Sequence, residues 1–118
     1  MFNDNPCIMS KIGTIDFAGE SGKMYTFNVY SIDHNQFKPK SGVYVVTKRS
    51  DKADGKAVHK KLYIGSTEDF SKGFDNHEKR ECFLSEGANC ICAYWEDSAE
   101  LREKIVEDLI DNYHPPCN

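Results

Sequence analysis

A lysine-rich segment is the first part of the sequence whose residue types could do chemistry. Residues 48–61 hold six Lys or Arg and only two Asp. Such a cluster suits contacts with a phosphate backbone, which are ionic and carry no base-sequence information. The same composition also fits the solvated tip of a hairpin. The side chains expected to contact nucleic acid are Lys48, Arg49, Lys60 and Lys61, with Lys72 further along the chain.

The cysteines are a second candidate set, at positions 7, 82, 90, 92 and 117. Their odd number, and an N-terminus without a secretory leader, predict free thiols in a reducing, cytoplasmic compartment. A zinc site would combine Cys90 and Cys92 with His114 and Cys117, but zinc-binding cysteine pairs are separated by two to four residues rather than one. We therefore expect small core residues that share one face of a strand, and no bound metal.

Length and composition bound the class of protein. The 118 residues match one domain, and with 39% hydrophobic and 12% aromatic residues a real core is expected rather than disorder. No run of about 18 apolar residues is present, so we expect no membrane span and no membrane partner. The net charge of −4 gives no global attraction for nucleic acid, so any phosphate contact must be local.

The hydrophobic pattern predicts the elements that position these side chains. Alternating apolar residues around a Gly19–Gly22 turn indicate a β-hairpin, short apolar runs indicate buried strands, and Ser66-x-x-Asp69 resembles a helix-capping box. Together the elements predict a single α/β domain over residues 1–118. They are a hairpin over 11–30, strands at 43–46 and 62–64 joined by a long basic loop, a helix over about 67–82, a strand over 90–95, and a helix over about 99–113 capped by Asp97 or Ser98.

Several side chains keep two interpretations. Arg102 falls inside the apolar half of the last helix, where it either snorkels to solvent or directs its guanidinium at a site over the sheet. Tyr94 and Trp95 either pack in the core or stack a nucleobase. His34 and His59 are expected on surface loops.

Two three-residue motifs and the C-terminal residues carry a family resemblance. Gly42-Val43-Tyr44 and Tyr63-Ile64-Gly65 are followed by a helix, a strand, a second helix and an ending of the form LI-x-x-Y-x-P-x-x-N over 109–118. This order resembles the GIY-YIG nuclease superfamily over residues 42–118. The resemblance implies a small central antiparallel sheet flanked by helices, with residues 1–41 as an added N-terminal hairpin extension. Members of this family cleave DNA.

The resemblance also implies roles for individual residues. Tyr44 and Tyr63 would line the site, and one of them would activate or position the attacking water. Gly65 would let the backbone turn closely into the next helix. His77 matches a histidine one turn beyond the family's catalytic arginine. Asn118 matches a terminal asparagine that braces the site.

Two expected residues are missing. Gly73 stands where the resemblance expects the catalytic arginine, and Val106 stands where it expects the metal-binding glutamate. Phosphodiester hydrolysis builds negative charge that a guanidinium and a divalent cation stabilise, and losing one such group costs about 2.7–4 kcal/mol. Arg80, two turns beyond Gly73 on the predicted helix, could return a positive charge, but no carboxylate replaces the glutamate. Mg²⁺ or Mn²⁺ is expected only if the chain cleaves.

Three functions from different classes follow. The leading hypothesis is a catalytically degenerate GIY-YIG-like protein that binds nucleic acid, DNA above all, or a protein partner. The second is an active metal-dependent DNA endonuclease with relocated charges. The third is a protein-interaction module, such as an inhibitor encoded by a mobile element, suggested by the acidic net charge and by residues 1–41.

Overall fold

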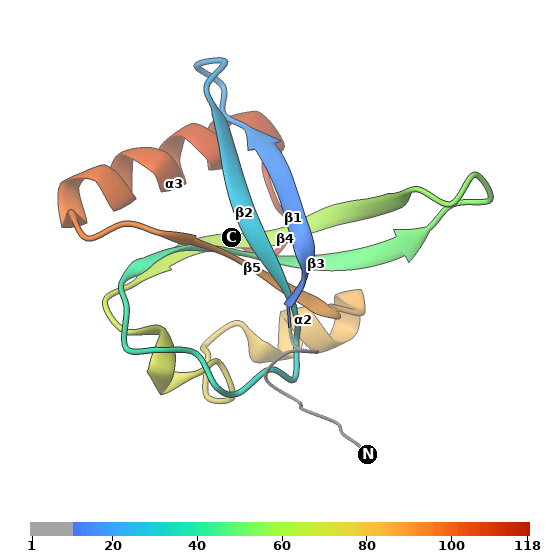
Figure 1. The fold of residues 1–118 in the computed structure, drawn as a ribbon, viewed down its shortest axis with the longest axis horizontal. Coiled ribbons are helices and arrows are strands. Elements are labelled where there is room, and N and C mark those ends of the chain that lie inside the picture. The colour runs from blue at the N-terminus through green and yellow to red at the C-terminus, as the bar shows by residue number, and fades with distance from the viewer. Residues whose placement is uncertain (1–10) are drawn as a thin grey trace.

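A curled five-stranded antiparallel sheet forms the framework of residues 11–118, the part of the chain that the computed structural model describes. The strand order is β1-β2-β5-β3-β4, so β1 and β4 are the edges. A long helix lies on one side of the central strands and a short helix on the other (Figure 1). This arrangement confirms the predicted α/β class. The elements are β1 (Lys11–Ala18), β2 (Met24–Ser31), β3 (Gly42–Asp51), β4 (Ala57–Thr67), the 3-10 helix η1 (Phe70–Lys72), α2 (Arg80–Glu86), β5 (Cys90–Trp95) and α3 (Ala99–Tyr113).

Strand alternation divides the core into two layers, because successive side chains of a strand point to opposite faces of the sheet. In β3, Val43 and Val45 pack on one face, and Tyr44 and Val46 pack on the other. We call the first the α3 face; its buried cluster is Phe17, Phe27, Val29, Val43, Val45, Ile64, Cys90, Cys92, Ile105 and Leu109. We call the second the α2 face; its buried cluster is Phe37, Tyr44, Val46, Leu62, Phe70, Phe83, Ile91, Ala93 and Cys117.

Helix α3 agrees with the prediction from its apolar stripe. Ser98 caps it by accepting a hydrogen bond from a backbone N–H of the first turn. Arg102 is buried and follows neither interpretation, because its guanidinium donates to the carbonyls of Glu96 and Asp97 at 3.0 and 2.8 Å. It therefore joins α3 to the end of β5. Within residues 11–118, no helix has the length and apolar character of a membrane-crossing segment.

The N-terminal hairpin of β1 and β2 extends the main sheet, because β2 pairs antiparallel with β5. Its turn also docks on α3. The carboxylate of Asp108 accepts hydrogen bonds from the backbone N–H and hydroxyl of Ser21, at 2.8 and 2.6 Å, and from the Tyr25 hydroxyl at 2.8 Å. One turn along, the Tyr113 hydroxyl accepts a bond from the Ala18 N–H at 2.9 Å. Helix α3 thus binds the hairpin as well as the central strands.

The predicted helix over residues 67–82 is wrong. Strand β4 continues to Thr67, η1 covers only three residues, and α2 begins at Arg80. Instead of forming a capping box with Ser66, Asp69 accepts from the Ser71 N–H at 2.8 Å and caps η1. Gly73 then ends η1 with φ +72° and ψ −171°, a combination adopted almost only by glycine. The segment from 73 to 79 is therefore irregular, and Arg80 shares no helical face with Gly73.

The predicted long basic loop is mostly strand. Strand β3 runs to Asp51 and β4 starts at Ala57, so the two strands form an arm that projects from the body of the molecule (Figure 1). The turn contains Asp54 and Gly55, as predicted, and Gly55 adopts φ +84°. The short tip leaves most of the basic residues on strands, where alternation assigns each to a face.

The prediction that all cysteines are free is wrong for two of them. Cys82 of α2 and Cys117 of the C-terminal segment form a disulfide with a Cα–Cα distance of 5.8 Å. The zinc site that would combine Cys90, Cys92, His114 and Cys117 does not form. Cys117 is held in the disulfide, and it lies on the α2 face, whereas Cys90 and Cys92 lie on the α3 face. The two strand cysteines are free, buried, and share one face as predicted; burial raises the pKa of Cys92 to about 12. Cys7 lies outside the described residues.

Replacing Asp108 tests the docking of the hairpin on α3. Asp108→Ala removes three hydrogen bonds to the hairpin, and we expect it to lower the free energy of unfolding by about 1–3 kcal/mol. Urea unfolding measures this change. The matched control is Asp111→Ala, one turn along the same helix, which should change the midpoint little. Equal midpoints for Asp108→Ala and the unsubstituted protein would contradict the docking role.

Candidate functional site

The two motif tyrosines are neighbours on the α2 face because of how β3 pairs with β4. Val46 lies opposite Tyr63, but Thr47 lies opposite Lys61, so Leu62 is one extra residue in β4. Such a bulge breaks the alternation at one position. Consequently Leu62 and Tyr63 both pack on the α2 face, and Lys61 points to the α3 face. The Tyr44 and Tyr63 rings are stacked with centroids 6.0 Å apart.

A hydrogen bond from His77 holds the Tyr44 hydroxyl. Nε2 of His77 lies 2.6 Å from that oxygen, and the backbone N–H of Lys79 donates to Nδ1 at 3.0 Å. Because Nδ1 accepts, we assign the ring proton of neutral His77 to Nε2, which then donates to Tyr44. Burial lowers the pKa of His77 and keeps the ring neutral near pH 7.

The phenols are held in the protonated form. Burial, with smaller effects from Tyr63 and Glu78, raises the pKa of Tyr44 well above its usual value. Burial also raises the pKa of Tyr63, and Glu78 adds to the effect. Both ring nitrogens of His77 are engaged, Nε2 with the Tyr44 hydroxyl and Nδ1 with the Lys79 N–H.

Gly65 leaves the space that the two phenols occupy. A Cβ on Gly65 would lie 2.8 Å from Cε2 of Tyr63 and 2.9 Å from the hydroxyl of Tyr44. Both distances are shorter than van der Waals contact. The glycine of the second motif is therefore needed for the approach of the tyrosine rings, and not for a turn into a helix, because β4 continues to Thr67.

The C-terminal residues bracket the second motif from the sheet edge. Oδ1 of Asn118 accepts from the Ile64 N–H and its Nδ2 donates to the Ile64 carbonyl, both at 2.8 Å. The N–H of Cys117 also donates to the Leu62 carbonyl at 2.8 Å. These bonds satisfy edge groups of β4 on both sides of Tyr63, and the disulfide to Cys82 ties the same segment to α2.

Neither missing charge can be restored by a simple replacement. A side chain at Gly73 would have to adopt a backbone conformation that costs non-glycine residues of order 1–3 kcal/mol. Val106 packs against the α3 face, whereas Tyr44 and His77 lie on the α2 face. A carboxylate at position 106 would therefore be separated from the tyrosines by the sheet.

Arg80, the expected substitute for the arginine, lines a different cavity. It starts α2 and borders a mainly apolar space of about 220 Å³ with Asp33 and Asp75 at its rim and Val46 in its wall. The lining includes neither motif tyrosine nor His77. Among the described residues, no group of three or more His, Cys, Asp or Glu side chains is placed to hold a metal ion.

The predicted basic residues are divided between the faces of the β3–β4 arm. Lys48 and Lys60 are cross-strand partners on the α2 side, and Lys60 forms an ion pair with Glu86 at 3.2 Å. Arg49 and Lys61 lie on the opposite side. The Lys61 ammonium sits over the Tyr113 ring at 4.5 Å from its centroid. Lys72 is exposed on η1, at the other end of the α2 face.

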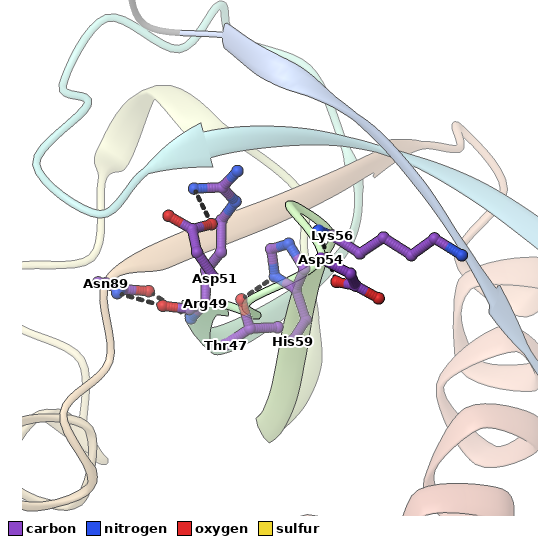
Figure 2. A network of polar contacts seen from close by, with 7 residues as sticks. All are labelled: Thr47, Arg49, Asp51, Asp54, Lys56, His59 and Asn89. Atoms are coloured by element: carbon purple, nitrogen blue, oxygen red, sulfur yellow. Dashed lines mark hydrogen bonds and ion pairs between the residues drawn. The ribbon is translucent and has the colours of Figure 1, made fainter.

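The arm carries a polar network that the sequence did not indicate. His59 is buried rather than on a surface loop, and its Nδ1 lies 2.8 Å from the Thr47 hydroxyl (Figure 2). The side-chain amide of Asn89 brackets the backbone of Arg49, at 2.7 and 3.0 Å, and the Arg49 guanidinium pairs with Asp51 at 3.4 Å. The Asn89 contacts join the arm to the start of β5, and sequence spacing gives no signal for them. The Thr47–His59 and Arg49–Asp51 contacts lie within the arm.

The aromatic residues on the α2 face form a continuous layer of ring contacts, which we call the aromatic layer. It runs from Tyr63 and Tyr44 through Phe74 and Phe70 to Trp95, with centroid distances of 4.8–6.2 Å between neighbours. His77 and Phe83 join it at one end and Phe37 at the other. Tyr94 points to the α3 face and packs against Phe27. Of the two aromatic candidates in β5, only Trp95 belongs to the layer.

A glycine-to-alanine pair tests the packing of the motif tyrosines. Gly65→Ala forces the Tyr44 and Tyr63 rings apart, and overpacking of this kind typically costs about 1–3 kcal/mol. Gly13→Ala, in β1, is the control because its Cβ meets nothing within 4 Å. We expect urea unfolding to show a clear loss of stability for the first variant and at most a small change for the second. Equal losses of stability in the two variants would contradict the close approach of the tyrosine rings to Gly65.

Acidification should destabilise the fold through its histidines. Burial lowers the pKa of His34, His59 and His77, so the unfolded chain binds more protons once the pH falls below about 6.5. The stabilisation is fully present above that value and is lost as the pH falls through the lowered pKa values. The free energy of unfolding, measured in urea, should be lower at pH 5.5 than at pH 7.5. His59→Gln should make the difference between the two pH values smaller. A free energy of unfolding that is the same at both pH values would contradict the lowered pKa values of the histidines.

Comparison with known proteins adds no assignment to this geometry. No protein-family model, no curated protein and no solved structure matches the chain. The site must therefore be interpreted from its own contacts. These are a buried, hydrogen-bonded pair of tyrosines, a glycine-only turn at position 73, lysines near both ends of one face, and an aromatic layer between them.

Proposed function

We propose that this protein is a GIY-YIG-like domain that binds nucleic acid without cleaving it. The observation that carries the proposal is the backbone conformation of Gly73. Not only is the arginine side chain missing at this position, but the backbone itself disfavours an arginine. The turn has taken a conformation that an arginine would not adopt without strain. With Val106 on the far side of the sheet, no residue at either expected position stabilises the charge that develops on a phosphoryl group.

The remaining features of the α2 face support binding. Strand β3 begins beside Trp95 at Gly42 and reaches Lys48 six residues later, a span of about 20 Å at the usual rise per residue. Lysines lie near both ends of this span: Lys40 and Lys72 near Trp95, and Lys48 and Lys60 beside the end of α2. The aromatic layer lies between them; Tyr44 and Phe70 are buried within it, and Tyr63, Phe74 and Trp95 are partly exposed. Cations separated by partly exposed rings suit a nucleic-acid strand, whose bases can stack on such rings.

The absence of cleavage is tested directly. We expect supercoiled plasmid incubated with Mg²⁺ or Mn²⁺ to be nicked no faster by the unsubstituted protein than by Tyr63→Phe, because the site lacks both charge-stabilising groups. Nicking that Tyr63→Phe abolishes would overturn the proposal in favour of a nuclease with relocated charges. Arg80→Ala would then show whether that arginine takes part.

Binding is tested with a labelled oligonucleotide by fluorescence anisotropy over a range of salt concentrations. Affinity should fall as salt rises, and Lys48→Gln should weaken binding and reduce the slope of log K against log salt. Lys104→Gln, on the outer side of α3, removes the same charge from a distant surface and should leave the slope unchanged. No salt-dependent binding to any nucleic acid would favour the protein-interaction alternative.

A further inference from the structure

A groove of aromatic and basic residues opens beside Trp95. It has a volume of about 360 Å³, within the range of small-ligand pockets. Its walls come from the end of β2, the connection to β3, and the end of β5. The lining residues are Tyr30, His34, Gln36, Phe37, Lys38, Lys40 and Trp95.

The rings in the groove hold one another in place. His34 stacks on Tyr30 with centroids 4.8 Å apart and an interplanar angle of 20°. Phe37 meets both rings edge-on, at 4.3 and 4.9 Å, and contacts Phe70 of the aromatic layer at 5.4 Å. These ring contacts hold Tyr30, His34 and Phe37 in place, so little ordering of these three side chains is needed when a base stacks in the groove.

The groove combines aromatic rings with lysines and has no carboxylate, a combination that three other hollows of the described residues do not have. A hollow beside Arg49 also lacks carboxylates, but no Phe, Tyr or Trp lines it. The lining of the groove at Trp95 includes Lys38 and Lys40 and no carboxylate. The cavity at Arg80 has two aspartates, and the hollow between the N-terminal hairpin and α3 has three acidic residues. Aromatic faces alone would also suit an organic cation, but two lysines at the rim repel a cation and attract an anion.

We propose that this groove binds an unpaired nucleobase of a single-stranded nucleic acid, with Lys38 and Lys40 contacting the adjoining phosphates. The inference rests on the proposed function and adds the kind of strand and the place where it is held. A base has an aromatic face for stacking and a phosphate beside it, which matches both properties of the groove. Bases inside a duplex are already stacked and do not present their faces.

Lys40 has a second role in this arrangement. Its ammonium lies over the Trp95 ring, 5.6 Å from the centroid, where it covers part of the surface that a base would use. A lysine side chain is flexible, so the ammonium moves from the ring to a phosphate when a base stacks on Trp95. Binding therefore exchanges a cation–π contact for a base–indole contact and an ion pair.

The intrinsic fluorescence of the protein reports on the groove directly, because Trp95 is the single tryptophan of the chain. We expect oligo(dT), an RNA oligonucleotide of uridine, or both to quench this fluorescence on binding, and a duplex of the same length to quench it weakly. Quenching by UMP or dTMP alone at comparable concentration would identify a mononucleotide rather than a strand as the ligand, and would overturn the single-strand part of the proposal.

Matched variants separate the groove from the rest of the surface. Lys40→Gln should lower the slope of log K against log salt for the single strand by about 0.7, the value for one phosphate contact, whereas Lys104→Gln should not. Trp95→Leu, followed by anisotropy, should weaken single-strand binding about 5- to 100-fold, in line with the loss of one stacked base. If Trp95→Leu fails to fold, the quenching and the Lys40→Gln slope still decide the outcome.

The experiments distinguish a wrong assignment of the groove from a wrong proposed function. Salt-dependent anisotropy with unchanged Trp95 fluorescence, and no effect of Lys40→Gln, would overturn the groove while nucleic-acid binding stands. Tighter binding of duplex than of single strand would overturn it as well. Absence of binding to every nucleic acid in anisotropy would overturn both proposals.

Discussion

The pairing of β3 with β4 is the constraint on which the rest of the site depends. With the bulge at Leu62, this register places Tyr44 and Tyr63 on one face and directs Lys61 to the other. A shift by one residue would move each of these side chains across the sheet. The register is specified by side-chain size, because Gly65, the partner of Tyr44, leaves room for both tyrosine rings.

The packing around the tyrosines is closed. Here burial and hydrogen bonding hold each phenol and the His77 ring in its neutral form. The bracket from Asn118 and the lack of space at Gly65 fix the same arrangement from two further directions. Together these contacts hold the Tyr44 side chain in a buried, fixed position.

Local patterns predicted some elements and could not predict others. The apolar stripe and the Ser98 cap located α3, and alternation with a glycine turn located the hairpin, because both signals arise from neighbouring residues. The helix over 67–82 failed because Asp69 and Gly73 stabilise a short 3-10 turn, which the capping-box pattern resembles. The Cys82–Cys117 bond depends on how two distant segments meet, which residue spacing does not predict. The His59–Thr47 contact depends on the register of β3 and β4, which residue spacing does not predict either.

The candidate site was only partly accessible from sequence. Tyr44, Tyr63, His77 and Asn118 come together as a group around the second motif, whereas Arg80 faces another cavity. The basic segment divides between two faces because strands, rather than a loop, carry it. The groove at Trp95 combines residues from three segments. Among them the sequence had pointed to Trp95 as a stacking residue and to His34 only as a surface residue.

The docking of the first hairpin on the last helix has a consequence for how the chain is made. Hydrogen bonds join Ser21 to Asp108 and Ala18 to Tyr113 across 87 and 95 residues. During synthesis the hairpin emerges long before its partner helix, and an isolated two-stranded hairpin is only marginally stable in water. The two central strands β3 and β4 can pair early, but β2 has to wait for β5 and the turn for α3. Contacts of such long separation slow folding, so the hairpin, although it is synthesised before α3, is among the last parts of the described chain to reach its final position.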